Sequence, residues 1–175
     1  MMWIFTGTLA FVMLILFEIQ KCRNILKKRK RINPWFVFGT FVLLLSFVGI
    51  AVQSNVATGI RFVLGILLIF VGLFSYIIVL TAGIDPNNYI LDVESSSVSR
   101  SGLYGRLRHP GVWSFLLFGV GFGMIFVGTL LMALCMVLMN YIYTWLQDRF
   151  FFSIYLQGYE EYKREVPFLI PRKRK

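Results

Sequence analysis

The stretch that decides the fold is Pro110 to Gln147, PGVWSFLLFGVGFGMIFVGTLLMALCMVLMNYIYTWLQ, which runs for 38 positions without a charged residue. A single helix of that length would measure about 57 Å, nearly twice the ~30 Å hydrocarbon core of a bilayer. The stretch must therefore cross the membrane twice. We predict a helical hairpin whose turn lies near Gly128 and Thr129.

The composition of the whole chain agrees with a membrane location. Of its 175 residues, 58% are hydrophobic and only 15% are charged, and the mean hydropathy is +0.74. Because a backbone in lipid must satisfy its own hydrogen bonds, apolar spans of this kind form helices. We expect an all-α integral membrane protein with one domain. The net charge of +10 sits beside the spans, where it meets lipid headgroups, so we expect the bilayer as partner and no nucleic acid.

Three further spans precede the hairpin. Met2 to Ile19 is apolar except for Glu18, and two uncharged stretches follow at residues 34–52 and 62–83. The short link at residues 53–58 leads us to expect the second and third spans to be antiparallel neighbours. The chain then divides into three N-terminal spans (1–83), a cytosolic loop (84–109), the hairpin (110–147) and a cytosolic C-terminal segment (148–175). We expect neither internal repeats nor a buried charge in mid-span, which disfavours a transporter.

Basic residues set the orientation. With about five spans, 17 of the 18 lysines and arginines fall on one side of the membrane, and Arg61 alone falls on the other. The side rich in positive charge is normally cytoplasmic. We therefore expect the N-terminus outside and the C-terminus in the cytosol, in a bacterial plasma membrane.

The loop before the hairpin ends in GLYGRLRHPG, residues 102–111, which brings two arginines and the only histidine to one interface. An arginine such as Arg108 can bind a carboxylate or phosphate through two parallel hydrogen bonds, and a helix starting at Pro110 favours an anion nearby. The alternative is that the arginines only anchor the span at the interface. Both readings stay open.

The end of the hairpin returns to the same side. Asp148 should therefore reach the depth of Arg108, either as part of a binding site or as a plain salt-bridge partner. Tyr159 and Tyr162 are three residues apart and share a helix face, which fits an aromatic belt as well as a pocket wall. Glycines in the first arm of the hairpin, Gly119 among them, suit close helix packing or close approach to a cofactor.

Several motifs occur in a fixed order: Gly102 and Tyr104, Arg-His-Pro at 108–110, the apolar hairpin, Asp148, Tyr-x-x-Tyr at 159–162 and Val-Pro-x-x-Ile-Pro at 166–171. This order resembles the isoprenylcysteine carboxyl methyltransferase and phospholipid methyltransferase family, whose members are small membrane enzymes that use S-adenosylmethionine. The resemblance covers residues 102–171, some 40% of the chain. The first three spans match only in being hydrophobic.

The resemblance implies a set of site residues. It gives Arg108 and Asp148 catalytic roles, and it gives cofactor-binding roles to Tyr104, His109, Pro110, Gly119, Gly121, Gln147, Tyr159 and Tyr162. Two positions depart from the family pattern. Gln147 replaces the first glutamate of a pair, and Val112 stands where a tyrosine is usual, with Trp113 beside it as the aromatic substitute.

The implied activity is methyl transfer from S-adenosylmethionine to an amphiphilic acceptor at the cytosolic membrane face, either a prenylcysteine-like carboxylate or a lipid headgroup. In that role Arg108 would orient a carboxylate, and Asp148 would hold the amino group or ribose of the cofactor. Two alternatives remain. The departures at Gln147 and Val112 also fit a non-catalytic relative that binds a membrane partner, and a nicotinamide-dependent membrane reductase is a third possibility.

The orientation can be tested by cysteine labelling. In a background where Cys22 and Cys135 are replaced by serine, a membrane-impermeant thiol reagent added outside should modify Ser54→Cys and spare Ser96→Cys, because the two positions lie on opposite sides. The reverse labelling pattern would contradict the assigned orientation.

Overall fold

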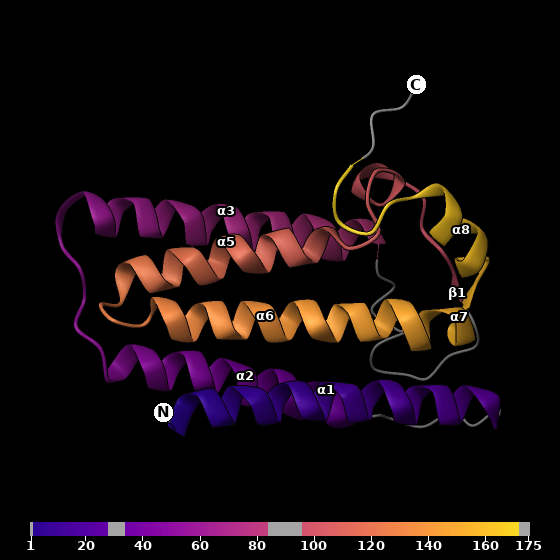
Figure 1. Ribbon diagram of the computed structural model, residues 1–175, viewed down its shortest axis with the longest axis horizontal. Coiled ribbons are helices and arrows are strands. Elements are labelled where there is room, and N and C mark those ends of the chain that lie inside the picture. The colour runs from indigo at the N-terminus through magenta and orange to yellow at the C-terminus, as the bar shows by residue number, and fades with distance from the viewer. Residues whose placement is uncertain (1, 28–33, 84–95, 172–175) are drawn as a thin grey trace.

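The computed structural model describes residues 2–27, 34–83 and 96–171 and consists of long helices lying side by side (Figure 1). The principal elements are α1 (Met2–Leu26), α2 (Pro34–Val52), α3 (Gly59–Gly83), α5 (Pro110–Ile125) and α6 (Leu130–Leu146). The predicted all-helical membrane architecture is confirmed at this level, since four helical segments are long and apolar enough to cross a membrane: Met2–Leu26, Pro34–Val52, Gly59–Thr81 and Leu130–Tyr155. α5 is a shorter apolar helix.

Shorter elements gather at the end of the molecule where α5 begins (Figure 1). They are β1 (Ser96–Ser97), the 3-10 helix η1 (Gly102–Gly105), the π-helical turn η2 (Gln147–Phe151), α7 (Phe152–Tyr155), β2 (Leu156–Gln157) and α8 (Tyr159–Glu165). The two-residue strands pair in parallel and tie the loop before α5 to the C-terminal segment. Three stretches of the predicted cytosolic side, residues 28–33, 84–95 and 172–175, lie outside the described residues.

The predicted hairpin is present. α5 ends at Ile125 and α6 begins at Leu130, so the turn falls where the sequence indicates. Gly128 adopts a φ of 79°, a left-handed conformation that other residues rarely take. The Thr129 side chain donates a hydrogen bond of 2.7 Å to the Phe126 carbonyl and closes the turn.

The expectation that the second and third spans are neighbours is wrong. α2 packs mainly against α1 and α3 packs mainly against α5, and the hairpin of α5 and α6 lies between α2 and α3 (Figure 1). The link at residues 53–58 is extended and runs along the hairpin turn, where the amides of Ala57 and Val127 donate to the carbonyls of Ile125 and Asn55. Six extended residues reach ~20 Å, about two helix diameters, so a short link does not force adjacency.

Close contact between α3 and α5 depends on glycine. A Cβ atom at Gly72 would lie 2.7 Å from the Phe118 nitrogen and 2.9 Å from the Ser114 carbonyl oxygen. In lipid, helices associate by van der Waals contact and hydrogen bonding, and small residues permit the closest approach. Aromatic side chains join α2 to α5, where the centroids of the Phe47 and Phe122 rings lie 5.0 Å apart.

The last long helix does not end at Gln147, the predicted end of the hairpin, after which the sequence places the cytosolic segment. Instead it widens into the π-helical turn η2 and continues as α7 to Tyr155. A π-helical turn inserts an extra residue, which changes the direction of the side chains that follow. Gln147 and Asp148 are both buried in this turn.

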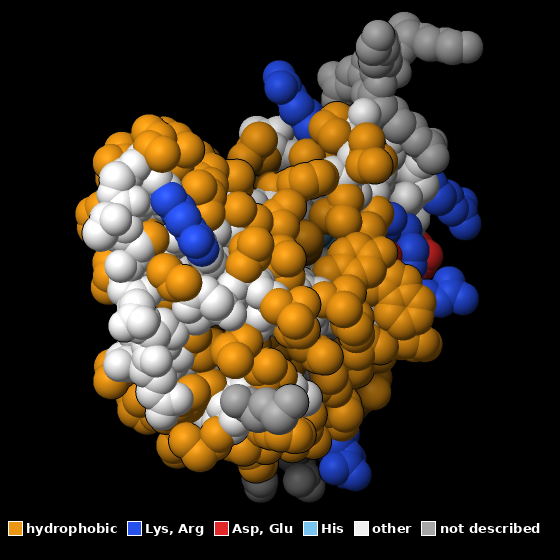
Figure 2. All heavy atoms as spheres, turned by 60° about the vertical axis from the view of Figure 1, so that its left-hand side comes forward, with side chains coloured by type: hydrophobic (Ala, Val, Ile, Leu, Met, Phe, Trp, Pro, Cys, Tyr) orange, Lys and Arg blue, Asp and Glu red, His pale blue; other side chains and the backbone are white. Residues whose placement is uncertain are grey.

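Large apolar side chains cover the outside of the bundle. Figure 2 shows hydrophobic groups over most of the face in view, with the Lys and Arg side chains mostly at its edges. On α3 the exposed fraction of Phe70 is 66% and that of Ile60 is 73%. An apolar surface of this extent suits contact with lipid tails and would be unfavourable in water.

The helix contact at Gly72 predicts a stability difference between two alanine variants. Gly72→Ala should lower the free energy of unfolding by about 1–3 kcal/mol, because the added methyl group meets backbone atoms that cannot move aside easily. Gly111→Ala in α5 is the matched control, since its Cβ would lie 3.7 Å from Val79. Thermal unfolding in detergent would contradict this packing if both variants behaved alike.

Candidate functional site

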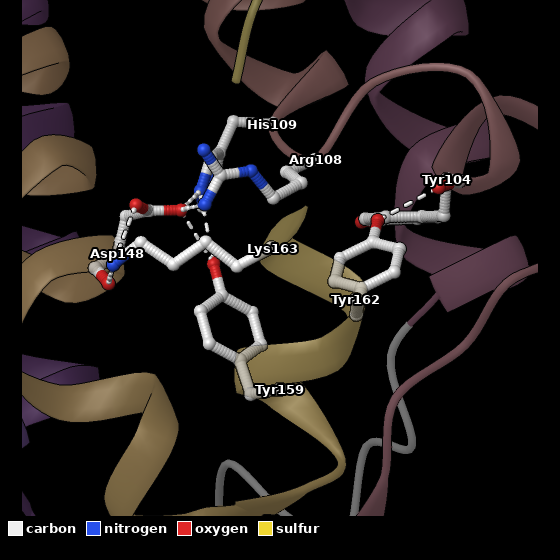
Figure 3. A network of polar contacts seen from close by, with 7 residues as sticks. All are labelled: Tyr104, Arg108, His109, Asp148, Tyr159, Tyr162 and Lys163. Atoms are coloured by element: carbon white, nitrogen blue, oxygen red, sulfur yellow. Dashed lines mark hydrogen bonds and ion pairs between the residues drawn. The ribbon is translucent and has the colours of Figure 1, made fainter. Parts of the chain in front are cut away.

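The carboxylate of Asp148 is the centre of a buried cluster (Figure 3). Its Oδ1 accepts hydrogen bonds from Arg108 Nη1 at 2.6 Å, from His109 Nε2 at 2.9 Å and from the Tyr159 hydroxyl at 2.6 Å. Asp148 and His109 are both buried, and the Arg108 side chain is 10% exposed. The predicted return of Asp148 to the depth of Arg108 is confirmed.

The positions of Arg108 and His109 are set by the start of α5 and by backbone hydrogen bonds to the C-terminal segment. Arg108 and His109 precede α5, whose first residue is Pro110, a residue suited to a first helical turn. Their amides donate to the carbonyls of Pro167 and Phe168 at 2.9 and 3.3 Å, so the C-terminal segment lies directly against the start of α5. This backbone pairing holds both basic residues over Asp148.

The two tyrosines of α8 point the same way, as the sequence predicts. Tyr159 donates to Asp148, while the Tyr162 hydroxyl donates to the Tyr104 carbonyl at 2.7 Å (Figure 3). Lys163 reaches back to donate to the Asp148 carbonyl at 3.0 Å. α8 therefore packs against both Asp148 and the η1 segment that carries Tyr104.

Burial lowers the pKa of His109 below its ordinary value of 6.5, and the nearby charges of Arg108 and Lys163 lower it further. The hydrogen bond to Asp148 opposes this shift without overcoming it. The imidazole is therefore neutral near pH 7. Because the ionised Asp148 only accepts hydrogen bonds, the proton of the neutral ring lies on Nε2.

The three tyrosines of the site stay protonated. Burial raises the pKa of Tyr104 and of Tyr162 to about 12, and it raises that of Tyr159 further. These side chains act as hydrogen-bond donors and not as bases at neutral pH.

A second buried cluster includes Gln147, the residue before Asp148, and is centred on Glu18 of α1. Glu18 of α1 accepts hydrogen bonds from Gln147 Nε2 at 2.6 Å, from the Tyr143 hydroxyl at 3.0 Å and from the Tyr155 hydroxyl at 2.8 Å. Glu18 is 0% exposed and Lys21, one helical turn later, is 4% exposed. Both ionisable side chains are thus buried in the C-terminal part of α1, at and just beyond the predicted end of the first span at Ile19.

A cavity of about 700 Å³ lies between α1, α2, α3 and the start of α5. Its polar lining includes Arg108, His109, Tyr159, Lys21 and Gln147. Its apolar lining comes from deeper in the bundle: Phe11, Leu14, Phe36, Leu43, Val112 and Phe115. The volume lies in the range of small-molecule sites. One cavity thus joins a polar end to an apolar interior.

Most of the residues implied by the resemblance meet at this cavity. Seven of the predicted site residues line it: Tyr104, Arg108, His109, Pro110, Gln147, Tyr159 and Tyr162. Asp148 lies behind them and holds three of them in place, which differs from the expected direct contact with a cofactor.

Two predicted cofactor-binding residues lie elsewhere. Gly119 packs against Val137 of α6, and Gly121 packs against Gly65 of α3, so both serve helix contacts away from the cavity lining. Trp113 is no aromatic substitute in the site either, since it is 45% exposed and donates through Nε1 to the Leu169 carbonyl.

Sequence reasoning missed the residues of the second cluster: Glu18, Lys21, Tyr143 and Tyr155. A signal was present, because Glu18 is the only acidic residue before Asp85 and it interrupts an apolar run. A lysine three residues later places both charges on one helix face. Such a pair in a span suggests a buried function more than an interface anchor.

The described fold is helical, with four segments long and apolar enough to cross a membrane, and it forms a cavity whose polar end lies beside a buried carboxylate. No family model, curated protein or solved structure was found to match this chain. The function must therefore be inferred from the geometry of the site and from the sequence motifs.

The neutral state of His109 can be measured directly, because the chain has a single histidine. An NMR titration of its imidazole in detergent should give a midpoint below 6.5, and Lys163→Met should raise that midpoint by removing a nearby positive charge. The unfolded chain takes up this proton near pH 6.5, so the free energy of unfolding should fall as the pH drops below 6.5. A midpoint at or above 6.5 would show instead that the imidazole is charged beside Asp148.

Proposed function

We propose that this protein transfers a methyl group from S-adenosylmethionine to an amphiphilic acceptor at the cytosolic face of the membrane. One observation carries the proposal: the Arg-His-Pro motif and the Tyr-x-x-Tyr motif, far apart in the sequence, line one cavity with an apolar interior, and Asp148 behind them joins the two motifs. The resemblance in motif order supports the same assignment.

The proposal includes a topology of five spans. α5 has 16 residues, ~24 Å of helix, and apolar Phe126 and Val127 follow it. It runs between α3 and α6 through the same layer as the long helices (Figure 1). Counting α5 as a span puts the N-terminus outside and places the cavity's polar end on the cytosolic side with most basic residues.

The polar end of the cavity has a donor that suits the carboxylate of the cofactor. The buried Nε of Arg108 has no hydrogen-bond partner among the described residues, although Nη1 of the same guanidinium binds Asp148. An unpaired buried donor costs about 1–3 kcal/mol, and a ligand oxygen would remove that cost. The unpaired Nε of Arg108 therefore supports binding of the cofactor carboxylate at this residue.

Tyrosine and phenylalanine side chains supply the rest of the fit. Tyr104, Tyr159, Tyr162 and Phe152 line the same end and offer aromatic walls with hydroxyl groups, suited to a nucleoside. The three hydroxyl protons are used by protein acceptors, namely the Val79 carbonyl, the Asp148 carboxylate and the Tyr104 carbonyl, so the hydroxyl oxygens are left to accept from a ligand. The predicted cofactor class thus matches the chemistry of the lining.

A cofactor of this class, held by Arg108 and the aromatic lining, would supply an activated methyl group to the acceptor and would leave as a neutral thioether. The protein needs no strong base for a carboxylate acceptor, which agrees with a neutral His109 held by Asp148. Its own contribution is to align the two reactants and to exclude water, and positioning of this kind supplies most of the rate.

The apolar part of the cavity suits the tail of the acceptor. Its lining from α1, α2 and α5 is formed by residues such as Leu14, Leu43 and Phe115. A lipid-like tail in this region would bring its head toward Arg108 and His109. An acceptor that enters from the bilayer would gain about 0.8 kcal/mol for each buried CH₂ relative to water, but little relative to lipid, so the polar head must supply specificity.

Titration of purified protein with S-adenosylmethionine tests the proposal. Arg108→Ala should weaken binding about 10- to 150-fold, the loss of one charge-assisted contact, while Arg106→Ala should bind normally because Arg106 lies outside the cavity lining. Asp148→Asn should also weaken binding, since Arg108 and His109 lose the charge that holds them. Asp148→Glu keeps that charge and should retain most of the affinity.

Absence of binding at millimolar S-adenosylmethionine by folded, monodisperse wild-type protein would overturn the proposal and favour the non-catalytic alternative. The same titration with reduced and oxidised nicotinamide dinucleotides examines the reductase alternative. Tight nicotinamide binding that depends on Arg108, without S-adenosylmethionine binding, would replace the proposed cofactor.

A further inference from the structure

We propose that Glu18 of α1 is a positioning residue of the cofactor site, and that it acts by turning the amide oxygen of Gln147 toward a hydrogen-bond donor of the ligand. This inference rests on the proposed function. It brings the first helix, which the motif resemblance leaves out, into the binding site.

Every hydrogen bond around Glu18 runs toward its carboxylate. The Tyr143 hydroxyl and the Gln147 amide nitrogen donate to Oε1, and the Tyr155 hydroxyl donates to Oε2. A buried carboxylate is costly unless donors such as these surround it. The buried Lys21 lies one turn along the same helix, on the same face as Glu18.

Two hydrogen bonds fix the orientation of the Gln147 side-chain amide. Its Nε2 donates both to Glu18 Oε1 at 2.6 Å and to the Tyr143 hydroxyl at 2.9 Å. The Tyr143 hydroxyl can accept there because its own proton goes to Glu18. Both N–H groups of the amide are therefore used, which leaves its oxygen for the cavity that Gln147 lines.

An acceptor oxygen at this position has a clear chemical use. It fits an N–H or O–H donor, such as the ammonium group or a ribose hydroxyl of the cofactor, while Arg108 offers a donor to the carboxylate. The family pattern has a glutamate at this position, which presents an oxygen without help. A glutamine presents its oxygen to the cavity only if its N–H groups are held on the side away from the cavity. The Glu18 carboxylate holds them there.

If Glu18 served only to pack α1 against α6, a polar cluster would be an unfavourable way to do it. Charged groups are costly within a span, and an apolar contact between α1 and α6 would be at least as stabilising. All three hydrogen-bond donors to Glu18, namely Tyr143, Gln147 and Tyr155, line the cavity, which ties the cost to the site. The buried charge is thus placed where it controls the cavity wall.

A double-mutant cycle on S-adenosylmethionine affinity tests the inference, with the thermal midpoint of the ligand-free protein measured for every variant. Glu18→Gln and Gln147→Met should each weaken binding about tenfold. The two together should weaken it no more than Gln147→Met alone, because Glu18 acts through Gln147. The exchange variant, Glu18→Gln with Gln147→Glu, should restore wild-type affinity, since residue 147 then presents a carboxylate oxygen that the new amide at position 18 supports from behind.

Leu9→Ala, on the exposed face of α1, is the control and should bind normally. Additive losses in the double variant, or a Glu18→Gln protein that is less stable but binds with unchanged affinity, would overturn the inference and leave Glu18 a structural role. If Arg108→Ala weakens binding and the Gln147 variants do not, this inference fails while the proposed function stands. If the wild type does not bind at all, both fail.

Discussion

The burial of one carboxylate, that of Asp148, holds the functional end of the molecule together. A buried anion is tolerated only when donors surround it, and here they come from the start of α5 and from α8. Each donor in turn fixes its own segment. Arg108 and His109 carry the backbone contacts to Pro167 and Phe168, so the C-terminal segment, the loop before α5 and the end of α6 are placed by the same charge.

The hairpin of α5 and α6 makes this arrangement possible, because it brings residues 108 and 148 to the same level of the bundle. Its place between α2 and α3 has a second consequence. The helices α1 and α6 are in contact, and Gln147 connects them through Glu18. The π-helical turn at η2 lets the neighbouring residues Gln147 and Asp148 face different partners, one toward α1 and one toward α5.

Much of the fold follows from hydropathy alone. The bounds of α2 and the turn at Gly128 could be predicted because charge, proline and glycine mark helix ends strongly. The order of helices in space could not, because an extended link of six residues reaches past a neighbour as easily as it joins one. The pairing of Arg108 with Asp148 was predictable from the length of the hairpin arms.

The remainder of the site was hidden for physical reasons. Glu18 looks like the end of a span when read along the sequence, and only the packing of α1 against α6 shows that it is enclosed. Gly119 and Gly121 lie at helix contacts and outside the cavity lining, since small residues in a span serve helix contact as readily as ligand contact, and sequence does not tell which face of α5 meets α3. Asp148 was recognised, but its Oδ1 is occupied by three protein donors.

The most direct test of the account is an experimental structure of the protein with the product S-adenosylhomocysteine, which contains every donor and acceptor of the cofactor apart from the sulfonium methyl group. The account predicts the ligand in the cavity between α1, α3 and the start of α5, with its carboxylate at the Arg108 guanidinium and a donor group at the Gln147 amide oxygen. A ligand bound outside this cavity, or an unliganded cavity in protein saturated with S-adenosylhomocysteine, would contradict it.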